Sequence, residues 1–351
     1  MTNKTKSQQP KKAYQNKPKQ TKQLAIVDHA RIDPSHCLAD RLFRPLFRGS
    51  QKSAALDVSY KARNSKLLLH WTGPELLSIS DQSIFLAIHR IAVQPECVER
   101  VGQNHPNPTF IKAREELHFA YQAVPLECLV ITTTLKEIGA ITQDTSLNGQ
   151  ARTRILQTLN RLSQVTLDIY DDSNPTAIAW QSRLISTSVS GKIVNIGINP
   201  MLSKAILTAP TTFIDMREQR ALSGDVSKRL HVWLSSWFGA NRVLEVRGIK
   251  RDTLISNIWG DVGQGDALYS RRSTLLTVLD ELNTLEGWSF SNDTRSNVIT
   301  IQRQPVKKVE NVEEDGSEKS DSTDGLPDST DGHSDLTDGN PDLTDGFSFA
   351  V

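Results

Sequence analysis

The sequence predicts an α+β protein in which two similar units lie between a basic end and an acidic end. In residues 152–170 the apolar spacing changes from that of a helix to that of a strand. The same apolar pattern returns 120 residues later, and charges of opposite sign are segregated at the two ends of the chain. These observations predict two folded units flanked by disordered tails.

Length and cysteine content limit the possible classes. At 351 residues the chain has room for two or three domains, because a single core rarely grows past roughly 250–300 residues. The cysteines Cys37, Cys97 and Cys128 are odd in number and far apart, so neither a disulfide framework nor a zinc site is indicated. There is no run of roughly 18 apolar residues, as a membrane span requires, and the lysine-rich start lacks the apolar run of a signal peptide. We expect a cytoplasmic protein without a membrane segment.

The two ends of the chain carry opposite charge. Residues 1–23 hold seven lysines and no acidic residue, whereas residues 309–351 hold thirteen of the 40 acidic residues. The acidic end repeats DSTDG or DLTDG with a period of seven from Asp321, which is not the spacing of a calcium-binding EF-hand loop. We expect a disordered basic arm over 1–24 and a disordered acidic tail over 306–351. The basic remainder is typical of nucleic-acid-binding proteins, although disorder alone also explains the ends.

The first unit contains two helices that lead into a strand. Apolar residues at 155, 156, 159, 162 and 165 have helical spacing, and Val165, Leu167 and Ile169 then alternate with polar residues. A helix therefore passes directly into a strand. The preceding segment 132–140, TTTLKEIGA, predicts a shorter helix with a threonine to cap its start and a glycine to end it.

The second unit repeats this order. At the offset of 120 residues, the apolar positions of the first long helix coincide with Leu275, Leu276, Leu279, Leu282 and Leu285. The segment 250–260, KRDTLISNIWG, predicts the shorter helix, capped by its aspartate and ended by its glycine. Two strands are predicted around Trp288 and Phe290 and at VITIQR, joined by the turn SNDTRSN. Each unit thus has the order helix, turn, helix, hairpin.

This order is that of the winged helix-turn-helix, in which the second helix lies in the major groove of DNA and the hairpin forms the wing. We expect two tandem domains of this kind, over residues 25–210 and 211–305. The outward face of the first long helix holds side chains that can form hydrogen bonds and no carboxylate. Because arginine can pair with guanine and glutamine with adenine, this face is the expected readout surface. A helix followed by a hairpin is also a common structural unit, and many winged domains bind proteins instead.

The candidate DNA-binding residues are polar or basic and lie on the predicted helices and the second wing. In the first domain they are Lys136, Gln150, Arg152, Thr153, Arg154, Gln157, Arg161 and Gln164. In the second domain they are Lys250, Arg251, Arg271, Arg272, Ser273 and Arg295. Because Asp280 and Glu281 are expected on the outer face of the second long helix, this domain should grip phosphates more than it reads bases.

Sequence motifs for catalysis are missing. The pair Gly191-Lys192 is followed by isoleucine and lacks the upstream glycine of a P-loop. No two of the eight histidines are one residue apart, as a metal site of a rolling-circle nickase would require. His29, His36 and Cys37 lie close together but have no further paired ligand, so we interpret them as structural. We expect no catalytic site, metal or cofactor. A catalytic group of carboxylates that the fold brings together from distant parts of the sequence remains open.

Several segments in the middle of the chain carry a resemblance to a known family. The segment RIDPSHCLADRLFRPLFRG is followed by LDVSY, WTGPELLSISDQSIFLAI, TTTLKEIGA, RLSQVTL, INPMLSKAI, DMREQRALSGDVSKRLHVWLSSW and DTLISNIW. In this order they resemble the RepC family, the replication initiators of IncQ-type broad-host-range plasmids. The resemblance extends from about Arg31 to Arg303 and includes neither end of the chain.

The resemblance implies an initiator that binds directly repeated origin sequences, called iterons, and promotes opening of an adjacent A·T-rich region. The implied partners are double-stranded DNA, the plasmid-encoded helicase and primase, and further copies of the chain on DNA. Without an ATP site, opening must draw on binding energy, and bending one site costs of the order of 1–6 kcal/mol. A transcriptional repressor with the same domains is the main alternative, since an initiator of this kind can also repress its own gene. A scaffold whose winged domains bind other proteins is a third.

Overall fold

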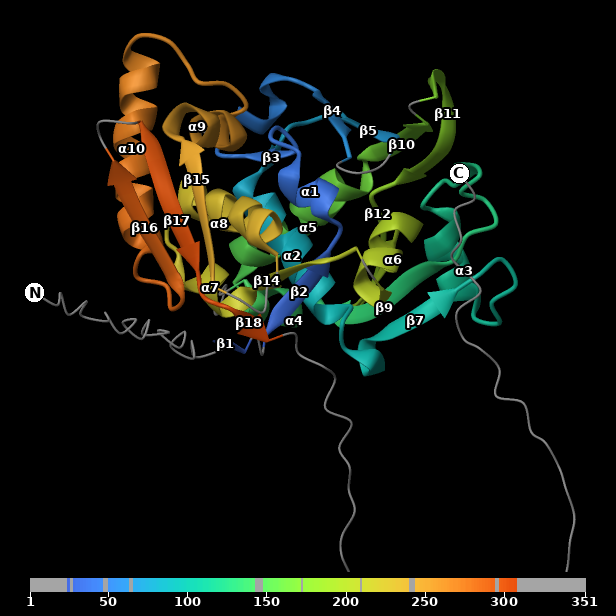
Figure 1. Ribbon diagram of the computed structural model, residues 1–351. Coiled ribbons are helices and arrows are strands. Elements are labelled where there is room, and N and C mark those ends of the chain that lie inside the picture. Colours follow the sequence, from blue (N-terminus) through green and yellow to red (C-terminus); the bar gives the residue numbers. More distant parts are fainter. Residues whose placement is uncertain are drawn as a thin grey trace, which may run out of the picture.

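The computed structural model describes residues 24–25, 28–46, 50–62, 66–142, 148–171, 173–208, 210–239, 244–293 and 297–307. Over these ranges the chain is a mixed α+β protein, as the sequence predicts. Figure 1 shows two groups of elements at opposite sides of the molecule, with helices α2 (Ile79–Ile91) and α8 (Asp225–Phe238) between them. No helix in the described ranges is both long and apolar enough to cross a membrane.

A five-stranded antiparallel sheet belongs to the first group, with the strand order β4-β5-β10-β11-β8. Its strands are β4 (Leu56–Lys61), β5 (Leu67–Gly73), β8 (Ala120–Tyr121), β10 (Thr166–Asp171) and β11 (Asn174–Arg183). Strand β10 is central, and its buried Leu167 lies opposite Trp71 of β5. The strand predicted after the first long helix is therefore paired on both sides.

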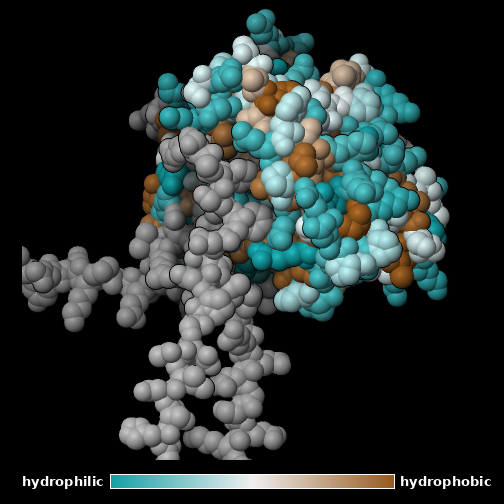
Figure 2. Space-filling model, turned by 90° about the vertical axis from the view of Figure 1, so that its right-hand side faces the viewer, coloured by the Kyte–Doolittle hydropathy of each residue, from teal (hydrophilic) through white to brown (hydrophobic). Residues whose placement is uncertain are grey.

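A four-stranded antiparallel sheet, in the order β12-β13-β9-β7, completes the first group. Its strands are β7 (Val98–Val101), β9 (Cys128–Thr134), β12 (Ile185–Ser190) and β13 (Ile193–Ile198). The helices of this group are α3 (Pro108–Glu115), α4 (Leu135–Ile141), α5 (Gly149–Ser163) and α6 (Pro200–Leu207). The side of the molecule that carries β11, β12 and α3 is mostly hydrophilic, with scattered apolar residues (Figure 2).

Short pairings join segments that are distant in sequence. Strand β14 (Thr212–Asp215) pairs antiparallel with β2 (His29–Ile32), and β3 (Phe43–Arg44) pairs in parallel with β6 (Leu77–Ser78). The short helices nearby are α1 (Pro34–Leu38), α7 (Met216–Ala221) and the 3-10 turns Ser50–Ser53 and Pro95–Cys97. The chain beyond residue 210 thus returns to pair with the first half before the second group begins.

Helix α8 contributes to the cores of both groups. Val232 lies in the core of the first group, whereas Leu230 and Leu234 lie in that of the second. The fully buried Arg229 donates hydrogen bonds to the carbonyl oxygens of Cys37 and Ala39 at 2.8 and 3.0 Å, and burial lowers its pKa to about 10. Because α8 packs into both cores, it joins the two groups. The hydrogen bonds of Arg229 hold the helix in place, since buried polar groups require fixed partners.

The second group is a helical pair covered by a small sheet. Its elements are β15 (Glu245–Lys250), α9 (Arg251–Trp259), α10 (Asp266–Leu282), β16 (Trp288–Asp293) and β17 (Val298–Arg303). The sheet is antiparallel, in the order β15-β17-β16. The predicted hairpin and its alternating Trp288 and Phe290, both buried, are confirmed. We call α4, α5, β10 and β11 the first unit, and α9, α10, β16 and β17 the second unit.

The predicted passage from helix to strand in the first unit is confirmed, since α5 ends at Ser163 and β10 begins at Thr166. Thr134 caps α4 by accepting a hydrogen bond from the backbone N–H of Glu137 at 3.1 Å. Gly139, expected to end this helix, lies inside it, because the helix continues to Ile141. The glycine was a wrong stop signal: Gly139 is buried within α4, and tertiary packing commonly overrides low helix propensity.

The caps of α9 are only partly as predicted. Gly260 ends the helix with φ of 85°, a left-handed conformation that favours glycine. Nη2 of Arg41 donates to its carbonyl oxygen at 2.7 Å. Asp252 does not cap the helix: Lys250 occupies the N-cap position, and no side-chain hydrogen bond caps that end. The carboxylate of Asp252 is instead held by Arg272.

The expected arm and tail lie almost entirely outside the described residues. Strand β1 (Leu24–Ala25) pairs in parallel with β18 (Val306–Lys307). The last residue assigned to the arm and the first two assigned to the tail therefore belong to a strand pair.

Candidate nucleic-acid interface

Helix α5 has one buried face and one polar face. Asn148 begins it, with Oδ1 accepting a hydrogen bond from the backbone N–H of Ala151 at 2.9 Å. Ile155, Leu159 and Leu162 are buried in the core of the first group. Full burial of one such side chain stabilises the fold by roughly 1.5–3 kcal/mol, so these residues determine which side of α5 meets solvent.

The outward face of α5 carries most of the residues predicted to read bases. The exposed members of the predicted set are Gln150, Arg152, Thr153, Arg154, Gln157 and Gln164. The hydroxyl of Thr153 donates to the carbonyl oxygen of Gly149 at 2.9 Å. The helix itself, GQARTRILQTLNRLS, contains no acidic residue. This face thus offers amide and guanidinium groups without a competing carboxylate from its own helix.

Arg161, predicted on the same face, is turned toward helix α2. Its Nη2 and Nε donate to Oδ1 of Asp81 at 2.6 and 3.1 Å, and the hydroxyl of Thr158 donates to the same oxygen at 2.8 Å. Asp81 is fully buried, and its Oδ2 accepts the backbone N–H of Ser78 at 2.8 Å. A buried carboxylate needs such partners, so Arg161 holds α5 against α2.

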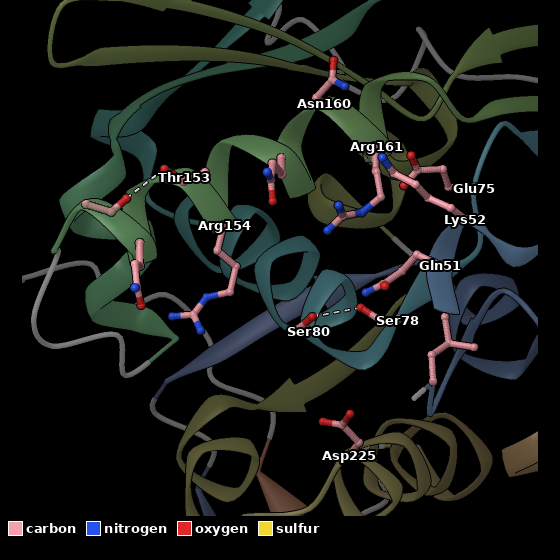
Figure 3. A pocket seen from close by; sticks show the side chains of 14 residues that line it. Gln51, Lys52, Glu75, Ser78, Ser80, Thr153, Arg154, Asn160, Arg161 and Asp225 are labelled. Atoms are coloured by element: carbon pink, nitrogen blue, oxygen red, sulfur yellow. Dashed lines mark hydrogen bonds between the residues drawn. The ribbon is translucent and has the colours of Figure 1, made fainter. Parts of the chain in front are cut away.

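A groove of about 1000 Å³ follows the exposed side of α5 (Figure 3). Arg154 lines it from α5, and Lys52, Glu75 and Asp225 line it from other segments. Burial raises the pKa of Asp225. Cations and carboxylates therefore both border the groove, and a polyanion lying along α5 would meet Arg154 and Lys52 as its cations.

Lys136 lies on α4, the helix that precedes α5 and packs against it. Its side chain is exposed, but it does not line the groove. The structure therefore places Lys136 on the helix before α5 and outside the groove.

The arginines predicted for the second unit are bonded to oxygen atoms of their neighbours. Arg272 donates to both carboxylate oxygens of Asp252 at 2.9 and 3.1 Å. Arg271 donates to the carbonyl oxygen of Asp261 at 2.8 Å and to its carboxylate, which lowers the pKa of that carboxyl. Nη2 of Arg251 donates to Oδ1 of Asn292 at 2.7 Å. The two aspartates offset the positive charge of Arg271 and Arg272, whereas Arg251 is held by a neutral amide.

The remaining predicted residues of the second unit differ in placement. Lys250 and Ser273 are exposed, at the start of α9 and on α10 respectively. Arg295 lies outside the described residues.

Glu281 does not face outward as the sequence predicts. It accepts hydrogen bonds from the backbone N–H and the hydroxyl of Ser223 at 2.6 and 2.9 Å, and from the hydroxyl of Ser227. Burial opposes its ionisation, but the bonds from Ser227 and Ser223 lower its pKa. The prediction failed because Ser223 lies just before α8 and Ser227 in its first turn, more than fifty residues away in the sequence. Asp280 is exposed as expected.

Two residues of this region were missed by the sequence analysis. Asp81 stands three residues after Ser78, and this spacing is the signature of a capping box. It predicts the start of a helix and could have drawn attention to Asp81. Lys52 has no comparable local signal, because only the fold brings it to the groove beside α5.

The three residues interpreted as structural, His29, His36 and Cys37, are buried. Each of them is less than a tenth exposed, and the described ranges hold no group of three residues arranged to bind a metal. Burial lowers the pKa of His29 to about 4 and raises that of the Cys37 thiol. All three cysteines are free thiols.

Comparison with known proteins identifies one family. A family model described as Replication protein C (RepC) matches residues 24–304. None of the curated proteins compared matches the chain. The crystal structure of domains 2 and 3 of RctB is 11% identical with a TM-score of 0.48, covering 77% of this chain and 97% of that chain. The Pi initiator protein in complex with iteron DNA is 12% identical with a TM-score of 0.36, covering 50% and 81%. Both likenesses are weak, and the family match is the informative one.

Proposed function

We infer that this chain, which belongs to the Replication protein C (RepC) family, is a plasmid replication initiator that binds the iterons of its origin. The observation that carries the DNA contact is the exposed face of α5, with Gln157 and Arg154 and no acidic residue of its own. Glutamine can form two hydrogen bonds with adenine, and arginine with guanine. A helix with these side chains fits base recognition in a major groove.

In this proposal each of the two units is a winged helix-turn-helix. Helices α4 and α5 precede the hairpin β10–β11, and α9 and α10 precede β16–β17. In this motif the first helix supports the second, and the second lies in the major groove. The shared apolar pattern of α5 and α10 supports the same role for both helices. Three of the matched pairs are buried in both, namely Ile155 and Leu275, Leu159 and Leu279, and Leu162 and Leu282.

The contacts divide into base readout and backbone contacts. Gln150, Gln157 and Arg154 on α5 are assigned to bases, while Arg152, Lys136 and Lys52 are assigned to phosphates. The lysines of residues 1–23 add a salt-dependent attraction that does not depend on the sequence. Arg161 acts in positioning α5 through Asp81.

Opening of the origin follows from binding without catalysis by this chain. A protein that binds a bent or unwound duplex better than a straight one shifts DNA toward that form. Bending one site costs of the order of 1–6 kcal/mol, so copies on adjacent repeats are needed to add their effects. The opened A·T-rich region is where the plasmid-encoded helicase and primase are loaded.

Nuclease protection on the plasmid that encodes this chain tests the function. We expect protection over tandem direct repeats beside an A·T-rich tract, and weaker protection with Gln157→Ala. Gln122→Ala, at an exposed residue beyond strand β8, is the matched control and should protect like the unmodified chain. Protection of an isolated promoter site without repeats would favour the repressor, and no protection anywhere would contradict both.

A further inference from the structure

The outward face of α10 carries hydroxyl and apolar side chains. Tyr269 is 74% exposed and Leu276 is 41% exposed. Ser273 and Thr277 are also exposed. Residues spaced by three, four and seven positions lie on the same side of a helix, so these four form one surface, the α10 stripe.

Ser273 and Thr277 of the α10 stripe stand where α5 has residues of its polar face, whereas Leu276 matches the half-buried Leu156. At the offset of 120 residues, Ser273 stands where α5 has Thr153, and Thr277 stands where α5 has Gln157. The two arginines of α10 are bonded to Asp261 and Asp252. The second helix therefore presents methyl and hydroxyl groups where the first presents amide and guanidinium groups.

This chemistry suits one base in particular. In the major groove only thymine presents a methyl group, and that methyl is recognised by apolar contact, for example with the methyl of a threonine. We propose that α10 reads thymine-containing base pairs in the iteron, through contact of Leu276 and Thr277 with thymine 5-methyl groups. The proposal rests on the proposed function, because it assigns α10 to the same duplex that α5 contacts.

The charges at the two ends of α10 agree with contact to bases over its first turns. Asp266, in the first turn, and Asp280, near the end, are both exposed, and carboxylates repel phosphates. The stripe from Tyr269 to Thr277 lies between them, in the N-terminal part from which recognition helices contact base edges. This assignment reverses the expectation from the sequence that the second domain mainly grips phosphates. Affinity for the backbone then comes from other parts of the chain, with Lys250 as an exposed cation in this unit.

Exposed apolar side chains on a helix are also found where proteins dock. On α10, however, Tyr269 and Leu276 are seven positions apart, with Ser273 between them on the same side and the hydroxyl-bearing Thr277 beside Leu276. Hydroxyl groups can bond to base edges of either type, so the mixture fits the floor of a major groove better than a dry interface.

The test is a cycle of DNA and protein substitutions with the full chain. The probe is a duplex of the protected repeat in which single thymines are replaced by deoxyuracil, which removes only the 5-methyl group. Thr277→Ser removes the methyl and keeps the hydroxyl, and Leu276→Ala shortens the apolar side chain. Thr253→Ser, at an exposed threonine of α9, is the matched control.

We expect uracil at one or two positions to weaken DNA binding about fourfold, both for the unmodified chain and for Thr253→Ser. This factor corresponds to about 0.8 kcal/mol, the free energy gained by burying one CH₂ group. At those positions Thr277→Ser or Leu276→Ala should bind thymine and uracil DNA equally.

Equal affinity of the unmodified chain for thymine and uracil DNA, with the repeats still protected, would overturn the inference and leave the proposed function standing. Uracil sensitivity that persists in both α10 variants would also overturn it. If, in addition, Leu276→Ala abolishes self-association, the α10 stripe binds another copy of the chain and not thymine. Failure of the unmodified chain to bind the repeats specifically would overturn the function and the inference together.

Discussion

Arg161 of α5 donates two hydrogen bonds to Oδ1 of Asp81, at 2.6 and 3.1 Å, while Oδ2 of Asp81 caps the start of α2. One buried carboxylate therefore fixes both the beginning of α2 and the position of α5. The polar face of α5 is held in place by the core before any ligand arrives, and this preorganisation favours a single binding geometry.

Arg161→Ala should lower the free energy of unfolding by about 3–5 kcal/mol, because it leaves the buried carboxylate of Asp81 without its charged partner. Binding to cognate and random DNA should weaken in parallel, with base preference unchanged. Urea denaturation and binding titrations measure the two effects. Arg152→Ala, at an exposed arginine of the same helix, should change the free energy of unfolding by less than about 0.5 kcal/mol. An altered base preference with unchanged stability would instead make Arg161 a base reader.

Gln157→Ala should weaken binding to the iteron by about 1–3 kcal/mol and relax the preference at one base position. The reason is that the exposed Gln157 is assigned to a base edge. Competition titrations with single-base variants of the repeat measure this, with Gln122→Ala as the control. Losses of the same size on cognate and random DNA would contradict the readout assignment.

Removal of residues 1–23, which contain seven lysines and no acidic residue, should weaken binding to cognate and random DNA alike. The slope of log affinity against log salt concentration should become shallower by about 0.9 for each phosphate that the shortened chain no longer neutralises. Titrations at several salt concentrations measure that slope. A weakening confined to the cognate repeat would show that this segment reads sequence.

Stability should fall as the pH falls from about 6.5 to about 4. His89 is fully buried, its Nδ1 donates to the carbonyl oxygen of Phe85 at 2.8 Å, and burial lowers its pKa to about 4. In the unfolded chain the imidazole of His89 becomes protonated near pH 6.5, but in the folded chain only near pH 4. Between these pH values protonation favours the unfolded chain, and the loss of stability reaches about 3 kcal/mol. His29, whose pKa burial also lowers to about 4, acts in the same direction.

Urea unfolding at several pH values in this window measures the effect. His89→Gln should show a smaller loss of stability on acidification than the unmodified chain, whatever its stability at neutral pH. Parallel pH dependences of the two chains would contradict the assignment to His89.

Local patterns predict α5 and β10 correctly because both elements take their sidedness from apolar spacing within the segment itself. The same holds for the hairpin that contains Trp288. The pairing of β10 with β5 has no such local signature, since its partner residues lie about a hundred positions earlier. The pairing of β2 with β14 joins segments separated by about half the length of the chain.

The candidate site follows the same division. The exposure of Gln157 and Arg154 follows from the buried positions of α5, and the sequence predicts it. The partner of Arg161 is eighty positions away, and those of Arg272 and Glu281 also come from other elements. Whether a basic residue faces solvent or a carboxylate depended on tertiary contacts that the sequence pattern does not contain.

Copies of the chain on successive repeats should act on one face of the duplex. Repeats spaced near whole helical turns let their bends add. Inserting about half a turn between two repeats should therefore leave affinity for a single repeat intact and abolish opening of the A·T-rich tract. Opening that persists after the insertion would mean that the copies act independently.

The most direct test of the account is whether binding alone opens the origin. Permanganate reactivity of unpaired thymines is measured in a supercoiled origin plasmid with purified protein and no nucleotide. The account predicts reactivity in the A·T-rich tract that rises steeply with protein concentration. No reactivity when the repeats are saturated, or reactivity only after ATP is added, would contradict it.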